Sequence, residues 1–140
     1  DLFVRGFCCL KPGVPGLSAN IRVVSVIGQF LEHSRIYHFA NGQEDPAAGE
    51  YYIGSADWMY RNLGRRVEAI TPIEDPGLRR RLWQILTVML RDERQAWDMH
   101  ADGAYTQRTP RDPAVQIGTH EALMRLYDPS RGAVDPSLLP

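Results

Sequence analysis

The stretch that most constrains the fold covers residues 23–39, where two apolar runs enclose a polar cluster. Residues 23–27 are mostly β-branched and are followed by Gly28, which is typical of an inner β-strand. Residues 36–39 predict a second strand, and the link between the two has room for at most about two turns of helix. Because ligands of α/β folds bind at strand ends, the polar cluster at residues 32–35 is the first candidate for a functional site.

His33 is the side chain of this cluster best suited to chemistry, because an imidazole titrates near neutral pH. A single histidine between strands is as often a hydrogen-bonded structural residue, and the segment alone leaves both interpretations open. His38 lies inside the second predicted strand, and we assign it a structural role on the same argument.

Composition narrows the classes of function. A chain of 140 residues with 44% hydrophobic content can bury one ordinary core, so we expect a single domain. The net charge of −1 gives no basic field that would attract nucleic acid. Fifteen of the 16 basic residues are arginines, whose guanidinium fork fits phosphate and carboxylate oxygens. GC-rich coding sequence also enriches arginine, and it is the favoured explanation for most of the fifteen.

The cysteines and the apolar runs bear on the cellular setting. Cys8 and Cys9 are adjacent, so in a strand they point to opposite faces and cannot form an ordinary structural disulfide. This favours a reduced, cytoplasmic setting, with peripheral membrane association left open. No run approaches the roughly 20 apolar residues of a transmembrane segment. The chain starts at Asp1 within an apparent strand and without Met, so we expect a piece of a longer protein.

Two further predicted strands carry polar side chains. Residues 2–10 have the apolar density of a buried strand, and Arg5 is the one charge within it. Such a charge needs a partner, a ligand or a place at the strand end. Residues 51–53 predict a short strand, after which Ser55 and Asp57 offer a hydroxyl and a carboxylate to a ligand.

The remaining elements are predicted to be mainly structural. Asp75-Pro76 is a strong helix start, and apolar residues recur at helical spacing from there to residue 93. Asn41-Gly42 and Asp102-Gly103 predict the turns of two hairpins. The other predicted elements are a turn or single helical turn at 58–62 that carries Arg61, a strand at 67–73, a hairpin at 96–107, an amphipathic helix at 113–127 and a loosely ordered tail at 128–140.

Three blocks of sequence carry a resemblance to a known family. They start at Val4, Ile27 and Tyr51 and are VRGFCCLKPGVPGLSANIRV, IGQFLEHSRIYHF and YYIGSADWMYRNLGRRVE. Their order and spacing resemble the C-terminal catalytic portion of type-one bacterial polyphosphate kinase, over about residues 2–108. The resemblance implies an α/β, phospholipase-D-like fold with a mixed β-sheet flanked by helices in a single domain. Residues 1–127 are then expected to be the second phospholipase-D-like catalytic domain of a longer enzyme.

The resemblance also implies an activity. Members of the family reversibly transfer the terminal phosphoryl group of ATP to inorganic polyphosphate, with Mg²⁺ and through a phosphohistidine. The phosphorylated histidine lies in a related domain that this chain lacks, so we expect the chain alone to be inactive. The implied partners are ATP or ADP, polyphosphate, the remaining domains of the same enzyme and further copies of it in a homo-oligomer.

The resemblance assigns roles to individual residues. His33 matches the histidine of the second domain and is expected to act as an acid or base, while Arg5 matches an arginine that contacts phosphates. Arg35 and Arg61 are expected to be further phosphate-binding residues.

Wider phospholipase-D relatives carry a His-x-Lys pair and a Gly-Ser-x-Asn segment. In this chain Arg35 stands in place of the lysine and Asp57 in place of the asparagine, which fits the polyphosphate kinase pattern. Ser55 and Asp57 are therefore expected to support the site and not to act as they do in phospholipases.

Two other functions stay open. The chain could be a polyanion-binding module that holds polyphosphate and does no chemistry. It could also be a stand-alone phosphodiesterase, which would need a dimer to bring two copies of His33 together. An imidazole of His33 buried in the interior, far from the Arg5 guanidinium and from any groove, would contradict the catalytic hypothesis.

Overall fold

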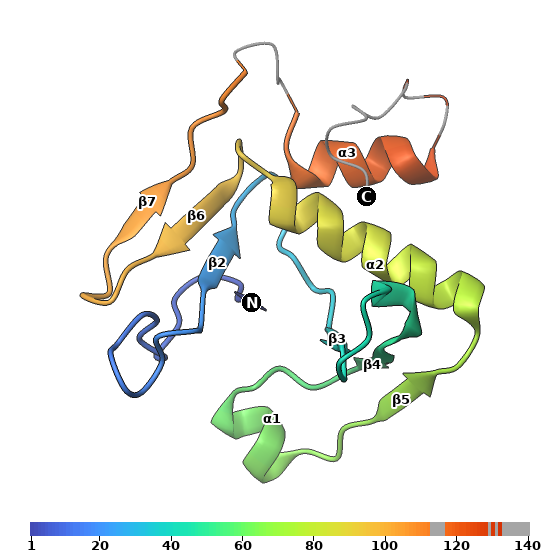
Figure 1. Ribbon diagram of the computed structural model, residues 1–140, viewed down its shortest axis with the longest axis horizontal. Helices are drawn as coiled ribbons and strands as arrows, with labels where there is room; N and C mark the ends of the chain where they lie inside the picture. The colour runs from blue at the N-terminus through green and yellow to red at the C-terminus, as the bar shows by residue number, and fades with distance from the viewer. Residues whose placement is uncertain (113–116, 129, 131, 133–140) are drawn as a thin grey trace. The chain divides into compact units, whose positions relative to one another are not determined.

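The computed structural model describes residues 1–112, 117–128, 130 and 132 (Figure 1). The chain divides into two compact units, one formed by Asp1–Glu32 with Thr87–Pro140 and the other by His33–Leu86. Each unit contains one β-sheet. The expected α/β fold class is confirmed, and its strands form two sheets.

The first unit is built on a mixed four-stranded sheet in the order β1-β2-β6-β7. Its strands are β1 (Leu2–Phe3), β2 (Val23–Val26), β6 (Ala96–Met99) and β7 (Tyr105–Gln107). β1 is parallel to β2, whereas β2, β6 and β7 pair antiparallel. All four residues of the inner strand β2 are buried, as its β-branched sequence predicts. The hairpin of β6 and β7 is also confirmed, with Gly103 at a φ of 88° in its turn.

The predicted strand at residues 2–10 is wrong beyond Phe3. The Val4 N–H still donates to the Val24 carbonyl of β2 at 2.9 Å, but the strand ends, and Gly6 adopts a φ of 76°, which lies outside the β region. Instead of continuing the ladder, the carbonyl oxygens of Val4 and Gly6 each lie 2.8 Å from the hydroxyl oxygen of Ser25 on β2. The apolar side chains of this segment are not all buried, and Phe7 is 94% exposed.

Two helical segments complete the first unit, namely α3 (Thr119–Tyr127) and the last residues of α2 (Pro76–Arg91). Val88 and Ala122 are fully buried, and the partly buried Ile117 and Leu123 pack against them. The last helix was expected to start at residue 113, and the structure places its start later. Gly118 is extended, with φ −110° and ψ −170°, so α3 begins one residue later.

The rest of that prediction lies outside the described residues. Residues 113–116 and most of the predicted tail at 128–140 are not among the positions that the structure describes. The boundary between domain and tail at residue 127 therefore stays a prediction.

The second unit is built on an antiparallel sheet in the order β3-β4-β5. The strands are β3 (Ile36–Phe39), β4 (Glu50–Gly54) and β5 (Ile70–Ile73), with the 3₁₀ helix η1 (Pro46–Ala48) before β4 and the helix α1 (Tyr60–Arg65) after it. Asn41 and Gly42 have φ values of 50° and 75°, and the N–H of Gln43 donates to the carbonyl of Ala40 at 2.9 Å. The predicted Asn-Gly turn is thus confirmed.

Helix α2 begins as its sequence predicts, because Asp75 caps it. The Asp75 carboxylate accepts a hydrogen bond from the Leu78 N–H at 2.8 Å, and Pro76 is the first helical residue. The helix ends at Arg91, two residues before the predicted end. None of the helices in the described part of the chain combines the length and apolar character needed to cross a bilayer.

Candidate functional site

Arg5 is positioned by strand β2 of the first unit. The two carbonyl oxygens that flank Arg5 in the sequence share the single hydrogen of the Ser25 hydroxyl, which restrains the backbone of Arg5 beyond the end of β1. The Arg5 side chain is half-buried, and its Nη1 donates to the carbonyl oxygen of Glu32 at 3.3 Å. The expectation that this charge needs a partner is therefore met by a backbone carbonyl.

His33 is exposed, so it does not lie in the interior of the protein. It belongs to the second unit, as do Arg35, Arg61, Ser55 and Asp57, whereas Arg5 belongs to the first. The link that precedes β3 contains no helical turn, because residues 27–35 form bends and irregular backbone. His33 is thus presented by an irregular segment just before a strand.

Arg35 ties this segment to the end of β4. Its Nη1 donates to the carbonyl of His33 at 2.8 Å, while its Nε and Nη2 each lie 3.1 Å from the same carboxylate oxygen of Asp57. The N–H of Gly54 donates to the Arg35 carbonyl at 3.1 Å. The structure therefore brings His33, Arg35 and Asp57 together.

Ser55 has a different partner, Glu68. The Ser55 hydroxyl donates to one Glu68 carboxylate oxygen at 2.6 Å, and the Asn62 amide donates to the other at 2.7 Å. These hydrogen bonds, that of Ser55 first, lower the pKa of Glu68. Arg61 lies next to the buried Asn62 on α1 and is itself exposed. Glu68 and Asn62 were not predicted from the sequence, because a buried asparagine on a short helix has no distinctive sequence signal.

His120, at the start of α3, is a further residue that the sequence did not predict. Its side chain is only 6% exposed, and its Nε2 lies 3.9 Å from a carboxylate oxygen of Glu32. Glu32 is 88 positions earlier in the sequence and directly precedes His33. No local sequence pattern predicts this contact, because it forms only when the first unit folds and brings the two residues together.

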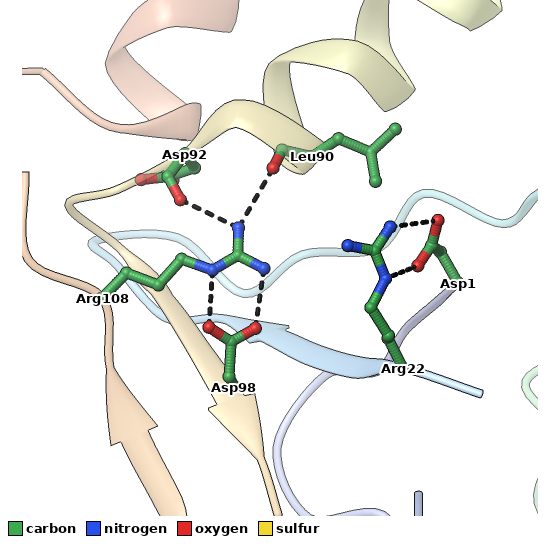
Figure 2. A network of polar contacts seen from close by, with 6 residues as sticks. All are labelled: Asp1, Arg22, Leu90, Asp92, Asp98 and Arg108. Carbon is green, nitrogen blue, oxygen red and sulfur yellow. Dashed lines mark hydrogen bonds and ion pairs between the residues drawn. The ribbon is translucent and has the colours of Figure 1, made fainter. Parts of the chain in front are cut away.

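A groove of about 1020 Å³ in the first unit is lined by none of the predicted site residues. Figure 2 shows the polar network around Arg108, which lines this groove together with Asp98 and Leu90. Arg108 holds both carboxylate oxygens of Asp98, at 2.7 and 2.8 Å, and donates to the carbonyls of Leu90 and Asp92 at 3.0 and 3.2 Å. The hydrogen bond from Arg108 lowers the pKa of Asp98. These charges are therefore engaged within the protein, and the network is structural.

The described residues do not assemble a metal site of their own. Among them there is no group of three or more His, Cys, Asp or Glu side chains placed to hold a metal ion. Asp57, the carboxylate among the predicted site residues, is engaged by Arg35. Magnesium commonly uses only one or two protein carboxylates together with substrate phosphates, so it does not require a group of three such side chains.

Comparison with known proteins places these residues in a family. Residues 1–117 match the family model described as "Polyphosphate kinase C-terminal domain 2". The chain is 60% identical over 124 residues to a polyphosphate kinase of Thermosynechococcus vestitus, covering 89% of this chain and 16% of the relative. It is 52% identical over 138 residues to a polyphosphate kinase of Synechocystis, covering 99% of this chain and 18% of the relative.

A solved structure gives the same answer. The crystal structure of polyphosphate kinase from Porphyromonas gingivalis matches with a TM-score of 0.77 and 37% sequence identity, over 90% of this chain and 18% of that chain. The present chain thus spans less than a fifth of the length of these relatives. On the match of residues 1–117, the chain belongs to the polyphosphate kinase family, as its C-terminal domain 2.

Proposed function

We propose that this chain supplies catalytic and phosphate-binding residues to a polyphosphate kinase, which reversibly transfers the terminal phosphoryl group of ATP to inorganic polyphosphate through a phosphohistidine. The observation that carries the proposal is the family match over residues 1–117. The phosphorylated histidine lies in another domain of the enzyme, so the chain alone is inactive. A homo-oligomeric, cytoplasmic enzyme is part of the same proposal.

His33 is the proposed acid or base. Phosphoryl transfer depends mainly on positioning and on groups that offset charge around the transferred phosphoryl group. An exposed imidazole can give a proton to the departing oxygen and take it back in the reverse reaction. The hydrogen bond from Arg35 to the His33 carbonyl supports this role, because it fixes the backbone from which the imidazole projects.

Arg5 is the proposed phosphate clamp, since its planar guanidinium can hold two phosphate oxygens at once. Arg61 is exposed and is proposed as a further phosphate contact. Arg35 is also proposed as a phosphate contact, but the neighbouring negative charge of Asp57 weakens its attraction for phosphate. Its main role is to hold the backbone of His33. Asp57 supports the site through Arg35.

Ser55 supports the site through Glu68, whose carboxylate it shares with Asn62 on α1. Mg²⁺ is proposed to enter together with the phosphates of ATP, because magnesium is commonly held by substrate phosphates and only one or two protein carboxylates. The proposed roles of His33 and the arginines therefore require no metal ligand from this chain.

Replacement of His33 in the full-length enzyme tests the proposal. Loss of a positioned group of this kind slows turnover by about 10²- to 10³-fold, so His33→Ala is expected to lose that much polyphosphate synthesis from ATP. Because His33 is exposed, the thermal unfolding midpoint should stay nearly unchanged.

His100→Ala is the matched control, since His100 is also an exposed histidine but lies at the hairpin of β6 and β7. It should keep normal turnover. Near-normal turnover of His33→Ala would reject the catalytic role. If polyphosphate binding then persisted, the polyanion-binding module would be the better description.

A further inference from the structure

The imidazole of His120 contacts both ends of the short segment that leads to His33. Its Nδ1 accepts a hydrogen bond from the N–H of Phe30 at 3.4 Å, and its Nε2 lies 3.9 Å from a carboxylate oxygen of Glu32. The Phe30 ring packs against the imidazole, with 5.8 Å between ring centroids. Residues 30–32 are therefore held by a side chain from a distant part of the sequence.

The hydrogen bond at Nδ1 defines which ring nitrogen of His120 carries the hydrogen. Because Nδ1 accepts from a backbone N–H, the neutral ring carries its hydrogen on Nε2, the atom that faces Glu32. That Nε2 is buried and has no hydrogen-bond partner among the described residues. A buried donor without an acceptor is unfavourable, and the negative charge of the Glu32 carboxylate, 3.9 Å away, offsets part of that cost.

His120 is itself held in place by its surroundings. Its backbone N–H donates to the Gln95 side-chain oxygen at 3.0 Å. A Cβ atom on Gly28 would collide with the side chains of both Gln95 and His120, so the chain passes close to them only because residue 28 is glycine. The imidazole is thus a fixed support against which residues 30–32 rest.

Glu32 connects this support to the candidate site. Its carbonyl oxygen accepts the hydrogen bond from Arg5 Nη1, and its carboxylate faces His120. We propose that His120 is a positioning residue, which acts through Phe30 and Glu32 to fix both the carbonyl that holds Arg5 and the backbone that leads into His33. This inference rests on the proposed function, in which Arg5 and His33 handle phosphate.

The first experiment measures the backbone and requires no activity. In the full-length enzyme, hydrogen exchange of a peptide covering residues 30–33 should be at least about tenfold faster in His120→Leu than in the parent, because the acceptor for the Phe30 N–H is lost. The second measures kinetics. His120→Leu should lose about 10²-fold in kcat for polyphosphate synthesis with KM for ATP changed by less than about threefold. His120→Gln should recover at least about tenfold of that loss, because its amide can still donate to Glu32.

His38→Leu is the matched control. The Nε2 of His38 likewise has no hydrogen-bond partner in the described part of the chain, but His38 is only partly buried and lies on β3 against Tyr51 and Trp83, at centroid distances of 4.6 and 5.2 Å. It should lower thermal stability without changing kcat or the exchange of residues 30–33.

A double-variant test separates positioning from general destabilisation. Glu32→Ala should cost much less activity in the His120→Leu background than in the parent, because the two side chains act as one unit. Fully additive losses, or a fall in activity that follows Tm equally in the His38 and His120 variants, would overturn the inference. An inactive His33→Ala with a fully active His120→Leu would overturn the positioning role alone. A fully active His33→Ala would defeat the proposed function, while faster exchange at residues 30–33 would still establish the support.

Discussion

Asp92 offers the sharpest test of how the first unit is held together. Its side chain is completely buried between the end of α2 and the start of α3. One carboxylate oxygen accepts from the N–H groups of Arg94 and Gln95 at 2.6 and 2.8 Å, and the other accepts from the N–H and hydroxyl of Thr119 at 2.8 and 2.6 Å. Asp92→Ala removes all four hydrogen bonds and leaves the first N–H of α3 without an acceptor.

The size of the effect follows from these contacts. The Thr119 N–H is buried, so its loss of an acceptor costs about 1–3 kcal/mol. The Arg94 and Gln95 donors are only partly buried and regain water, at about 0.5–1 kcal/mol each. Together with the Thr119 hydroxyl, the expected loss is about 3–5 kcal/mol, a large share of the roughly 5–15 kcal/mol that holds a typical domain together. Asp92→Asn should cost less, because the amide oxygen can still serve one pair of donors.

Hydrogen exchange in the full-length protein measures this locally. A loss of about 3–5 kcal/mol corresponds to at least about 10²-fold faster exchange, at about 1.4 kcal/mol per tenfold, in peptides covering residues 94–95 and 119–122. Asp102→Ala is the control, since the exposed Asp102 carboxylate accepts one turn hydrogen bond, from the Ala104 N–H at 2.9 Å. An Asp92→Ala protein whose exchange rises by less than about tenfold at these peptides would refute the reasoning.

Three further predictions follow from the same structure. Burial lowers the pKa of His38, so its contribution to stability is present above the unfolded pKa near 6.5 and is lost as pH falls through the lower folded value. His38→Phe should therefore reduce the decrease of Tm with falling pH below a pH of about 6.5, and an unchanged decrease would contradict this. Ser55→Ala should raise the pKa of Glu68, followed by NMR, toward its ordinary value, because it removes the hydrogen bond that lowers this pKa most. An unchanged pKa of Glu68 would exclude that cause. Arg108→Lys should cost about 1–3 kcal/mol of unfolding free energy in urea, because an ammonium cannot reproduce the two-pronged bond to Asp98, and a cost under about 0.5 kcal/mol would argue against it.

The features that could be predicted from sequence are those decided by neighbouring residues. The start of α2 depends on Asp75 and Pro76 alone, and the turns at Asn41-Gly42 and Asp102-Gly103 depend on backbone angles that glycine and asparagine adopt easily. The inner strand β2 was also predictable, because four consecutive buried positions require apolar or small residues. The segment around His33 was found for the same reason, since it lies between two predicted strands.

The features that escaped prediction depend on residues far apart in the sequence. The apolar segment after Phe3 does not continue as a strand, because Gly6 turns the backbone and the Ser25 hydroxyl binds the carbonyls of Val4 and Gly6. The hydrophobicity of the sequence predicts neither feature. The support of residue 30 by His120 joins positions 90 apart. The pairing of Ser55 with Glu68 spans 13 residues and crosses α1. Each requires the fold before it can be seen.

The arginine content shows why residue type alone does not identify the site. Within the described residues many arginines pair with carboxylates, and these pairs are Arg22–Asp1, Arg35–Asp57, Arg108–Asp98, Arg111–Glu93 and Arg125–Glu121. Arg108 donates to two carbonyls from Nη1 while its Nε and Nη2 hold both carboxylate oxygens of Asp98, a combination that the planar guanidinium allows and a single ammonium nitrogen does not. The bias toward arginine therefore has structural uses besides any affinity for phosphate. What singles out Arg5 is its bond to Glu32, the residue that directly precedes His33 and that His120 supports.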